Sequence, residues 1–268
     1  GRYSFSWARA IPRHCRDHEV FLALNDLFPP TVESIRAAFD ALIPQERIVA
    51  WQAPGPVAGF NPENRWRREV GERLREAFLA SLKPDVIHVS SLFEGFGDDA
   101  LTSIGALERR MPTSVTLYDL IPLLYPDTYL TEPVMESWYQ RKLSSLRRAQ
   151  LWLAISESTR RDGLALLGVP EERVVNVSAA SDPIFRPMQF SGEQADTIGR
   201  RYGLTRPFIM YTAGIDRRKN IEGLIKSYAK LAGPVRASHQ LAIVCSATQE
   251  QITALKHVAT QSGLAHDE

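Results

Sequence analysis

The chain has 268 residues, a length that suits one large domain or two modest ones. Apolar residues make up 44% of it and charged residues 24%, a mixture typical of folded globular proteins and not of disordered chains. Because 32 lysines and arginines balance 31 acids, no overall charge directs the protein to nucleic acid or to an anionic lipid surface. No run approaches the roughly 18 apolar residues of a membrane-spanning helix.

Strand-like and helix-like segments alternate along most of the chain, a pattern that predicts βαβ units around a parallel sheet. Apolar runs predict strands at residues 18–24, 47–51, 85–90, 112–117, 151–155 and 173–177. Helical patterns lie between them, at residues 3–11, 32–42, 62–82, 98–110, 132–148 and 157–167. The fold class that follows is α/β.

Residues 181–205 change in composition and suggest a linker followed by one helix at 193–202. After it the alternation resumes, with strands expected at 208–212 and 240–246 and helices at 221–232 and 248–262. We therefore expect a first domain over 1–183, a linker with a connecting helix over 184–206, and a second domain over 207–268. Two βα units are fewer than a doubly wound half-fold contains, so we expect the second domain to be incomplete.

Three stretches together resemble one family of enzymes: VTLYDLIPLLY at 115–125, ISESTRRDGLALLGVP at 155–170 and YTAGIDRRKNIEGL at 211–224. In this order they resemble the retaining GT-B glycosyltransferases often called glycosyl transferases group 1, and the resemblance covers nearly the whole chain. It implies a GT-B architecture of two Rossmann-like domains and a chain cut short at both ends. The first stretch looks most like transferases that build bacterial surface polysaccharides from nucleotide-linked mannose or a 6-deoxy relative.

The third stretch predicts a site for the donor diphosphate at Gly214, Arg218 and Lys219. A helix that starts after a strand offers free N–H groups to an anion, and two cations at that place need an anionic partner. Many family members carry Arg where this chain has Gly214, and Lys where it has Lys219. We expect Arg218 to replace the missing cation, so the role of Lys219 follows from the resemblance and that of Arg218 is our inference. The alternative is an ordinary solvated helix start.

The first stretch predicts two catalytic residues, Tyr118 and Asp119, where a strand gives way to a loop. Family members usually have His-Asp at this place. A tyrosine hydroxyl can still donate a hydrogen bond, but it cannot carry protons near neutral pH as histidine can. The alternative is that Tyr118 packs under the following loop and Asp119 caps a turn.

Four other features have plainer explanations. The stretch SLFEGFG at 91–97 resembles a donor-binding motif of the family, but its second glutamate is absent, so we interpret it as an acceptor-side loop with at most a minor role for Glu94. The arginine-rich helix at 62–78 alternates its charges and is expected to be a solvated helix. His88 lies within an apolar strand and is expected to be a core histidine. Cys15 and Cys245 are far apart in sequence and suit a reducing cytosol.

The function expected from the sequence is transfer of a hexosyl group from a nucleotide diphosphate sugar to a hydroxyl on a saccharide or lipid-linked saccharide. No metal or other cofactor is expected, and the chain alone is expected not to turn over. A cytoplasmic location is expected, with peripheral contact with the inner membrane left open. Two alternatives remain: another GT-B enzyme, such as a sugar-nucleotide epimerase, and a non-catalytic sugar-nucleotide-binding fragment.

Overall fold

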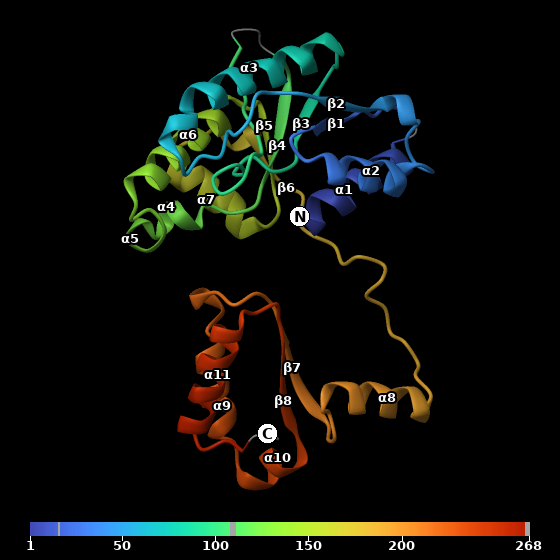
Figure 1. The fold of residues 1–268 in the computed structure, drawn as a ribbon, viewed down its shortest axis with the longest axis vertical. Helices are drawn as coiled ribbons and strands as arrows, with labels where there is room; N and C mark the ends of the chain where they lie inside the picture. The colour runs from blue at the N-terminus through green and yellow to red at the C-terminus, as the bar shows by residue number, and fades with distance from the viewer. Residues whose placement is uncertain (16, 108–110, 266–268) are drawn as a thin grey trace. The chain divides into compact units, whose positions relative to one another are not determined.

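The computed structural model describes residues 1–15, 17–107 and 111–265 of the chain. The chain divides into two compact units, Gly1–Ile184 and Phe185–Glu268, called unit 1 and unit 2 below. All paired strands in both units are parallel, and the two units share no sheet (Figure 1). The α/β class expected from the alternating pattern is therefore confirmed.

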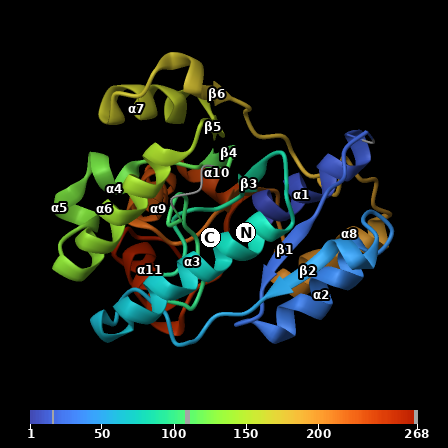
Figure 2. The ribbon, with the colours of Figure 1, turned by 90° about the horizontal axis from the view of Figure 1, so that it is seen from above.

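Unit 1 alternates strands and helices along its length. Its elements are α1 (Arg2–His14), β1 (Leu22–Asn25), α2 (Pro29–Phe39), η1 (Gln45–Arg47), β2 (Ile48–Trp51), η2 (Pro62–Asn64), α3 (Arg65–Ser81), β3 (Ile87–Val89), β4 (Thr113–Leu117), α4 (Ile121–Leu124), α5 (Pro126–Tyr129), α6 (Pro133–Arg148), β5 (Leu151–Ala154), α7 (Glu157–Leu167), η3 (Glu171–Arg173) and β6 (Val174–Asn176). The main sheet has the order β3-β4-β5-β6. Strands β1 and β2 pair separately and lie beyond β3 (Figure 2).

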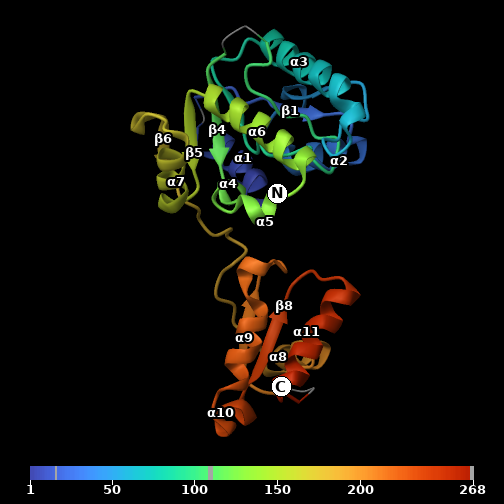
Figure 3. The ribbon, with the colours of Figure 1, turned by 90° about the vertical axis from the view of Figure 1, so that its left-hand side faces the viewer.

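The core of unit 1 forms where the apolar strands meet the apolar stripes of the helices. Val115 and Trp152 on neighbouring strands are fully buried, as expected for parallel strands covered on both faces. On α6, Leu143 and Leu146 are buried at helical spacing against the same cluster. Helix α7 contacts β5 and β6, the two strands at the end of the sheet away from β3 (Figure 3).

The helix predicted at 98–110 is absent from the described residues 98–107, which form an irregular loop, and residues 108–110 lie outside the described residues. The two aspartates that seemed to open a helix bind other backbone groups. Asp98 accepts a hydrogen bond from the amide of Ala100, and Asp99 accepts from the amides of Val57 and Ala58. Such side-chain bonds to the backbone compete with helix formation. Gly105 follows in the left-handed region, with φ of 74°.

The solvated helix predicted at 62–78 is observed as η2 and α3, but one face of α3 is buried. Arg68 and Glu76 are only 5% and 2% exposed. Glu76 accepts hydrogen bonds from the Ser103 hydroxyl at 2.7 Å and from the Leu107 amide at 2.8 Å. The alternating charges of the sequence do not reveal this, because the loop that contacts the helix comes almost thirty residues later.

Unit 2 contains one pair of strands and four helices among its described residues. Its elements are α8 (Gly192–Tyr202), β7 (Phe208–Thr212), η4 (Arg217–Lys219), α9 (Ile221–Ala229), α10 (Gly233–Ser238), β8 (Gln240–Val244) and α11 (Gln249–Gln261). Strands β7 and β8 pair in parallel in their own sheet, as predicted. Helices α9 and α11 lie together on one face of this sheet (Figure 1). The short helix α10 was not predicted.

Candidate functional site

The predicted catalytic pair lies at the carboxyl edge of the main sheet of unit 1. Tyr118 and Asp119 directly follow Leu117, the last residue of β4. In open parallel sheets, ligands bind beyond the carboxyl ends of the strands. The Tyr118 side chain is half-buried and that of Asp119 is exposed. The position expected for both residues at this edge is therefore observed, while their catalytic role remains a proposal.

The hydroxyl of Tyr118 is held by a residue that the sequence did not point to. It lies 2.7 Å from the Ser4 hydroxyl on α1, and its ring packs edge-on against Tyr3 with ring centres 5.5 Å apart. The backbone carbonyl of Tyr118 accepts a hydrogen bond from the Thr159 hydroxyl at 2.9 Å. Burial raises the pKa of the Tyr118 phenol above its usual value, and the hydrogen bond with Ser4 opposes this. Tyr118 therefore stays a neutral hydrogen-bonding group.

Asp119 caps the turn that follows it, as the alternative interpretation expected. Its Oδ1 accepts a hydrogen bond from the amide of Ile121 at 3.1 Å, at the start of α4. This bond occupies one of the carboxylate oxygens of an exposed side chain. Turn capping and contact with a substrate are compatible, because an ionised carboxylate has about four acceptor positions.

In the loop that contains SLFEGFG, the backbone conformation and close packing of the fold require Gly95. Gly95 has φ of 87°, and a Cβ at this position would lie 2.0 Å from the carbonyl oxygen of Ala100. The Gly95 carbonyl accepts the Gly59 amide at 2.8 Å, and Glu94 accepts a hydrogen bond from the Ser91 hydroxyl at 2.7 Å. The motif therefore has a structural explanation that does not involve a donor nucleotide.

His88 is a core histidine, as predicted. Its two ring nitrogens lie 2.8 Å from the Ser114 hydroxyl and 3.0 Å from the Thr116 hydroxyl, both on β4. The ring also packs against Trp7 with centres 4.1 Å apart. Burial lowers the pKa of His88 to about 4, so the ring is neutral at neutral pH.

The predicted donor residues lie in unit 2, on the segment that joins β7 to α9. Arg218 and Lys219 belong to the short turn η4, and α9 begins two residues after Lys219, at Ile221. The cations therefore precede the helix instead of lying in its first turn. One of the amides at the helix start is already used, because the Asn220 side chain accepts a hydrogen bond from the Gly223 amide.

Asp216 organises this turn, and the sequence analysis gave it no role. Its Oδ1 accepts the Arg218 amide at 2.8 Å and the Arg218 Nε at 3.0 Å. These two hydrogen bonds with Arg218 lower the pKa of the Asp216 carboxyl. Aspartates often accept the backbone amide two residues further on in a turn, so this bond could have been recognised. Lys219 is exposed, and no ion-pair partner for its ammonium is found in the part of the chain that the structure describes.

The described residues contain no group of three or more histidine, cysteine, aspartate or glutamate side chains placed to hold a metal ion. None of the described helices combines the length and the hydropathy that crossing a membrane requires.

Comparison with known proteins shows the family of the chain. The family model described as Glycosyltransferase Family 4 matches residues 1–180. Two serotype-specific mannosyltransferases of Escherichia coli, both named WbdA, are 29% identical to the chain over 269 and 262 residues. These alignments cover 100% and 97% of the chain but 32% of each relative, so the chain spans about a third of their length.

Solved structures with the same fold have low sequence identity to the chain. HepE of Anabaena, solved with UDP and glucose, has a TM-score of 0.60 at 13% identity, over all of this chain and 64% of its own. A glycosyltransferase of Rickettsia africae has a TM-score of 0.57 at 11% identity, over 93% of this chain and 67% of its own. At such identities the similarity concerns the fold, which is that of GT-B glycosyltransferases.

Proposed function

The chain belongs to glycosyltransferase family 4, and from this premise we propose that the protein transfers a hexosyl group from a nucleotide diphosphate sugar to a hydroxyl acceptor. The sugar is mannose or a 6-deoxy relative, and the product is a bacterial surface polysaccharide. The mannosyltransferase relatives support this choice of sugar, since they align with the chain over its whole length. The acceptor is a saccharide or a lipid-linked saccharide.

In this proposal unit 1 binds the acceptor and unit 2 binds the donor. Unit 1, whose sheet carries Tyr118 and Asp119 at its carboxyl edge, is the acceptor side. Unit 2 holds the diphosphate of the donor on the segment after β7. We assign the linker and its connecting helix to residues 184–206.

The observation that carries the donor assignment is the group of cations that follows Gly214. A Cβ at Gly214 would meet no atom within 4 Å, and its φ is not in the left-handed region. The described fold therefore does not require a glycine there, and the backbone is open to a ligand that approaches it closely. The exposed turn that follows carries three cations, Arg217 to Lys219, against the single acid Asp216.

The chemistry follows from where charge develops. As the glycosidic bond breaks, negative charge grows on the departing diphosphate, and the cations of the turn stabilise that charge more in the transition state than in the ground state. Arg218 is held in place by Asp216, and the exposed ammonium of Lys219 acts as a point charge on the phosphate. At the acceptor edge, the Tyr118 hydroxyl is held by Ser4 and serves as a neutral hydrogen-bonding group for the substrate.

The test is an assay of the protein at its natural full length with a panel of labelled nucleotide diphosphate sugars and a saccharide acceptor. We expect label to move to the acceptor only when both substrates are present. Conversion of the donor without an acceptor would instead indicate an epimerase, and binding without any conversion would indicate a sugar-nucleotide-binding module.

The Lys219→Ala variant tests the site within the same assay. We expect kcat to fall about a hundredfold, because the lost contact is of the kind worth roughly 2–4 kcal/mol in a transition state. Lys219→Arg is expected to recover part of the loss. Lys226→Ala is the matched control, since Lys226 is an exposed lysine of α9 that pairs with Glu222 at 3.5 Å. Equal kinetics for Lys219→Ala and the parent would reject the donor site.

A further inference from the structure

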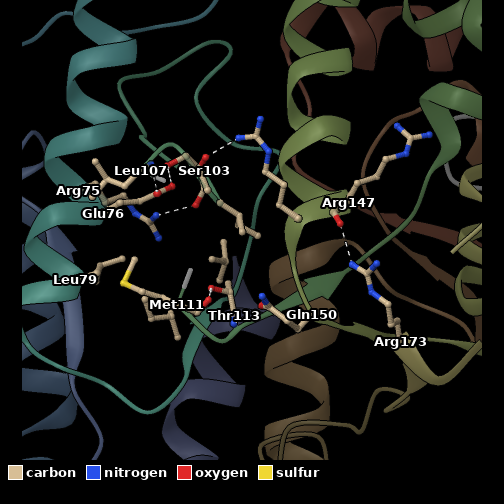
Figure 4. Close-up of a pocket in the computed structure, with 15 residues that line it drawn as sticks. Arg75, Glu76, Leu79, Ser103, Leu107, Met111, Thr113, Arg147, Gln150 and Arg173 are labelled. Carbon is tan, nitrogen blue, oxygen red and sulfur yellow. Dashed lines mark hydrogen bonds between the residues drawn. The ribbon is translucent and has the colours of Figure 1, made fainter. Parts of the chain in front are cut away.

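Unit 1 has a cavity of about 520 Å³ at the edge of its main sheet opposite Tyr118 (Figure 4). Ile87 and Thr113, the first residues of β3 and β4, line it, together with Gln150 and Arg173, which directly precede β5 and β6. We call it the basal cavity. It lies at the amino ends of the strands, whereas the proposed catalytic residues follow the carboxyl end of β4.

Four arginines line the basal cavity, and three of them come from three different elements. Arg75 belongs to α3, Arg148 to the last turn of α6 and Arg173 to the turn before β6. Arg75 donates to the Ser103 carbonyl at 3.0 Å, and Arg148 donates to the Gly105 carbonyl at 2.7 Å. Arg173 donates to the carbonyls of Arg147 and Ala149. Each guanidinium has five N–H donors, so these contacts leave donors available.

These arginines donate to neutral backbone carbonyls, and the nearby carboxylate of Glu76 accepts hydrogen bonds from other groups. Among the described residues that line the basal cavity, Glu76 is the one acid, and its two oxygens accept Ser103 and Leu107. Burial lowers the pKa of Arg75, and the carboxylates of Glu76 and Glu72 oppose this shift. With four arginines against one acid among the described lining residues, this wall carries net positive charge and favours an anion.

The cavity is also formed in advance. The loop from Ser103 to Leu107 is held by hydrogen bonds from α3 and α6, so its carbonyls and the arginines have fixed positions. Figure 4 shows Arg75 and Arg173 on opposite sides of the space, with Met111 and Thr113 between them. Apolar side chains, including Leu79 and Met111, complete the wall.

We propose that the basal cavity binds a small anion with a phosphate or diphosphate group, held by Arg75, Arg148 and Arg173. Arginine is suited to this chemistry, because its planar fork can donate two hydrogen bonds to one phosphate group. This site is distinct from the proposed donor site, which lies in unit 2, and it does not depend on the proposed function.

The experiment is calorimetric titration of the chain with inorganic pyrophosphate, and separately with inorganic phosphate, at constant ionic strength. We expect saturable binding of at least one of the two and a higher Tm in its presence. Arg148→Gln is expected to weaken binding about tenfold or more, since a charge-assisted hydrogen bond is lost. Arg148 is exposed, so circular dichroism of this variant should match that of the parent. If it does not fold, Arg173→Gln is the second variant, with the same expected weakening.

Two controls separate this site from other sources of binding. Arg147 also lines the cavity, but its guanidinium points away from the space in Figure 4, so Arg147→Gln removes the same charge and should change affinity less than twofold. Lys219→Ala should also leave this binding intact. Absence of saturable binding, equal weakening by Arg147→Gln and Arg148→Gln, or loss confined to Lys219→Ala would each overturn the proposal.

Discussion

Gly214 and Gly95 show how differently two glycines can be explained at the scale of the residue. Gly95 is required by its φ of 87° and by the carbonyl of Ala100, whereas nothing described around Gly214 excludes a methyl group. We therefore expect Gly214→Ala to leave the free energy of unfolding nearly unchanged and to weaken donor binding about tenfold, by blocking close approach of the diphosphate.

Gly95→Ala is the contrasting variant and should destabilise unit 1 without a specific effect on the donor. Urea unfolding and titration with a nucleotide diphosphate sugar measure the two quantities. Unchanged donor affinity in Gly214→Ala would show that the glycine serves neither the fold nor the ligand.

His88 gives a pH dependence with a definite sign. Its pKa is about 4 in the folded protein and ~6.5 in an unfolded chain, so the unfolded chain takes up a proton first as the pH falls. Its contribution to stability is complete above pH ~6.5 and is lost between that pH and about 4. The loss should be roughly 2 kcal/mol, because one pKa unit corresponds to about 1.4 kcal/mol and solvent reaches part of the ring.

The measurement is urea unfolding of the parent and of His88→Gln from pH 7 to pH 4. The parent should lose more stability than the variant over this interval. His18→Gln, which removes an exposed histidine, is the control. Parallel pH profiles for the parent and His88→Gln would contradict the assignment of the low pKa to His88.

The sequence predicted individual positions better than it predicted their partners. Tyr118 and Asp119 were expected at the end of a strand, because the apolar run before them stops there, and β4 does end at Leu117. The contact between Tyr118 and Ser4 joins residues 114 positions apart, and no local pattern contains that information. The bond between Asp216 and Arg218 is local and could have been predicted.

At the scale of elements, periodicity located most strands and helices but failed where side chains bind the backbone. Residues 98–107 contain acids where a helix could start. The carboxylate of Asp99, however, accepts hydrogen bonds from the amides of Val57 and Ala58, which lie more than forty residues earlier in the sequence. The partner loop decides the structure of this segment, and its position depends on the tertiary fold. The same reason explains why the buried face of α3 was missed.

Asp99→Ala tests this explanation. Val57 is fully buried, so removing the carboxylate leaves backbone amides at 2.6 Å and 3.0 Å without their acceptor. Unpaired buried donors cost about 1–3 kcal/mol, and we expect unit 1 to lose about 2 kcal/mol of stability. Asp98→Ala is the matched control, since the exposed Asp98 caps only the amide of Ala100 and should cost less than ~1 kcal/mol. Equal losses in urea unfolding would show that the bonds of Asp99 to the distant loop are unimportant.

At the scale of the whole molecule, the two units differ in how much core they have. The buried hydrophobic residues of unit 1 are spread over two sheets and several helices, whereas those of unit 2 are Ile221, Ile225 and Tyr228. On β7, Phe208 and Met210 remain 46% and 59% exposed. Small units bury a smaller share of their apolar surface and are less stable. We therefore expect unit 2 to unfold first.

The distribution of tryptophan makes this last prediction simple to measure. All five tryptophans of the chain lie in unit 1, at positions 7, 51, 66, 138 and 152. Tryptophan fluorescence should therefore follow the unfolding of unit 1 alone, while far-ultraviolet circular dichroism follows the helices of both units. If the units unfold independently, circular dichroism will show a transition at lower urea to which fluorescence does not respond. A chain ending at Ile184 should then keep the fluorescence midpoint of the 268-residue chain. Coincident transitions, or a shifted midpoint in the shorter chain, would mean that the two units unfold as one cooperative body.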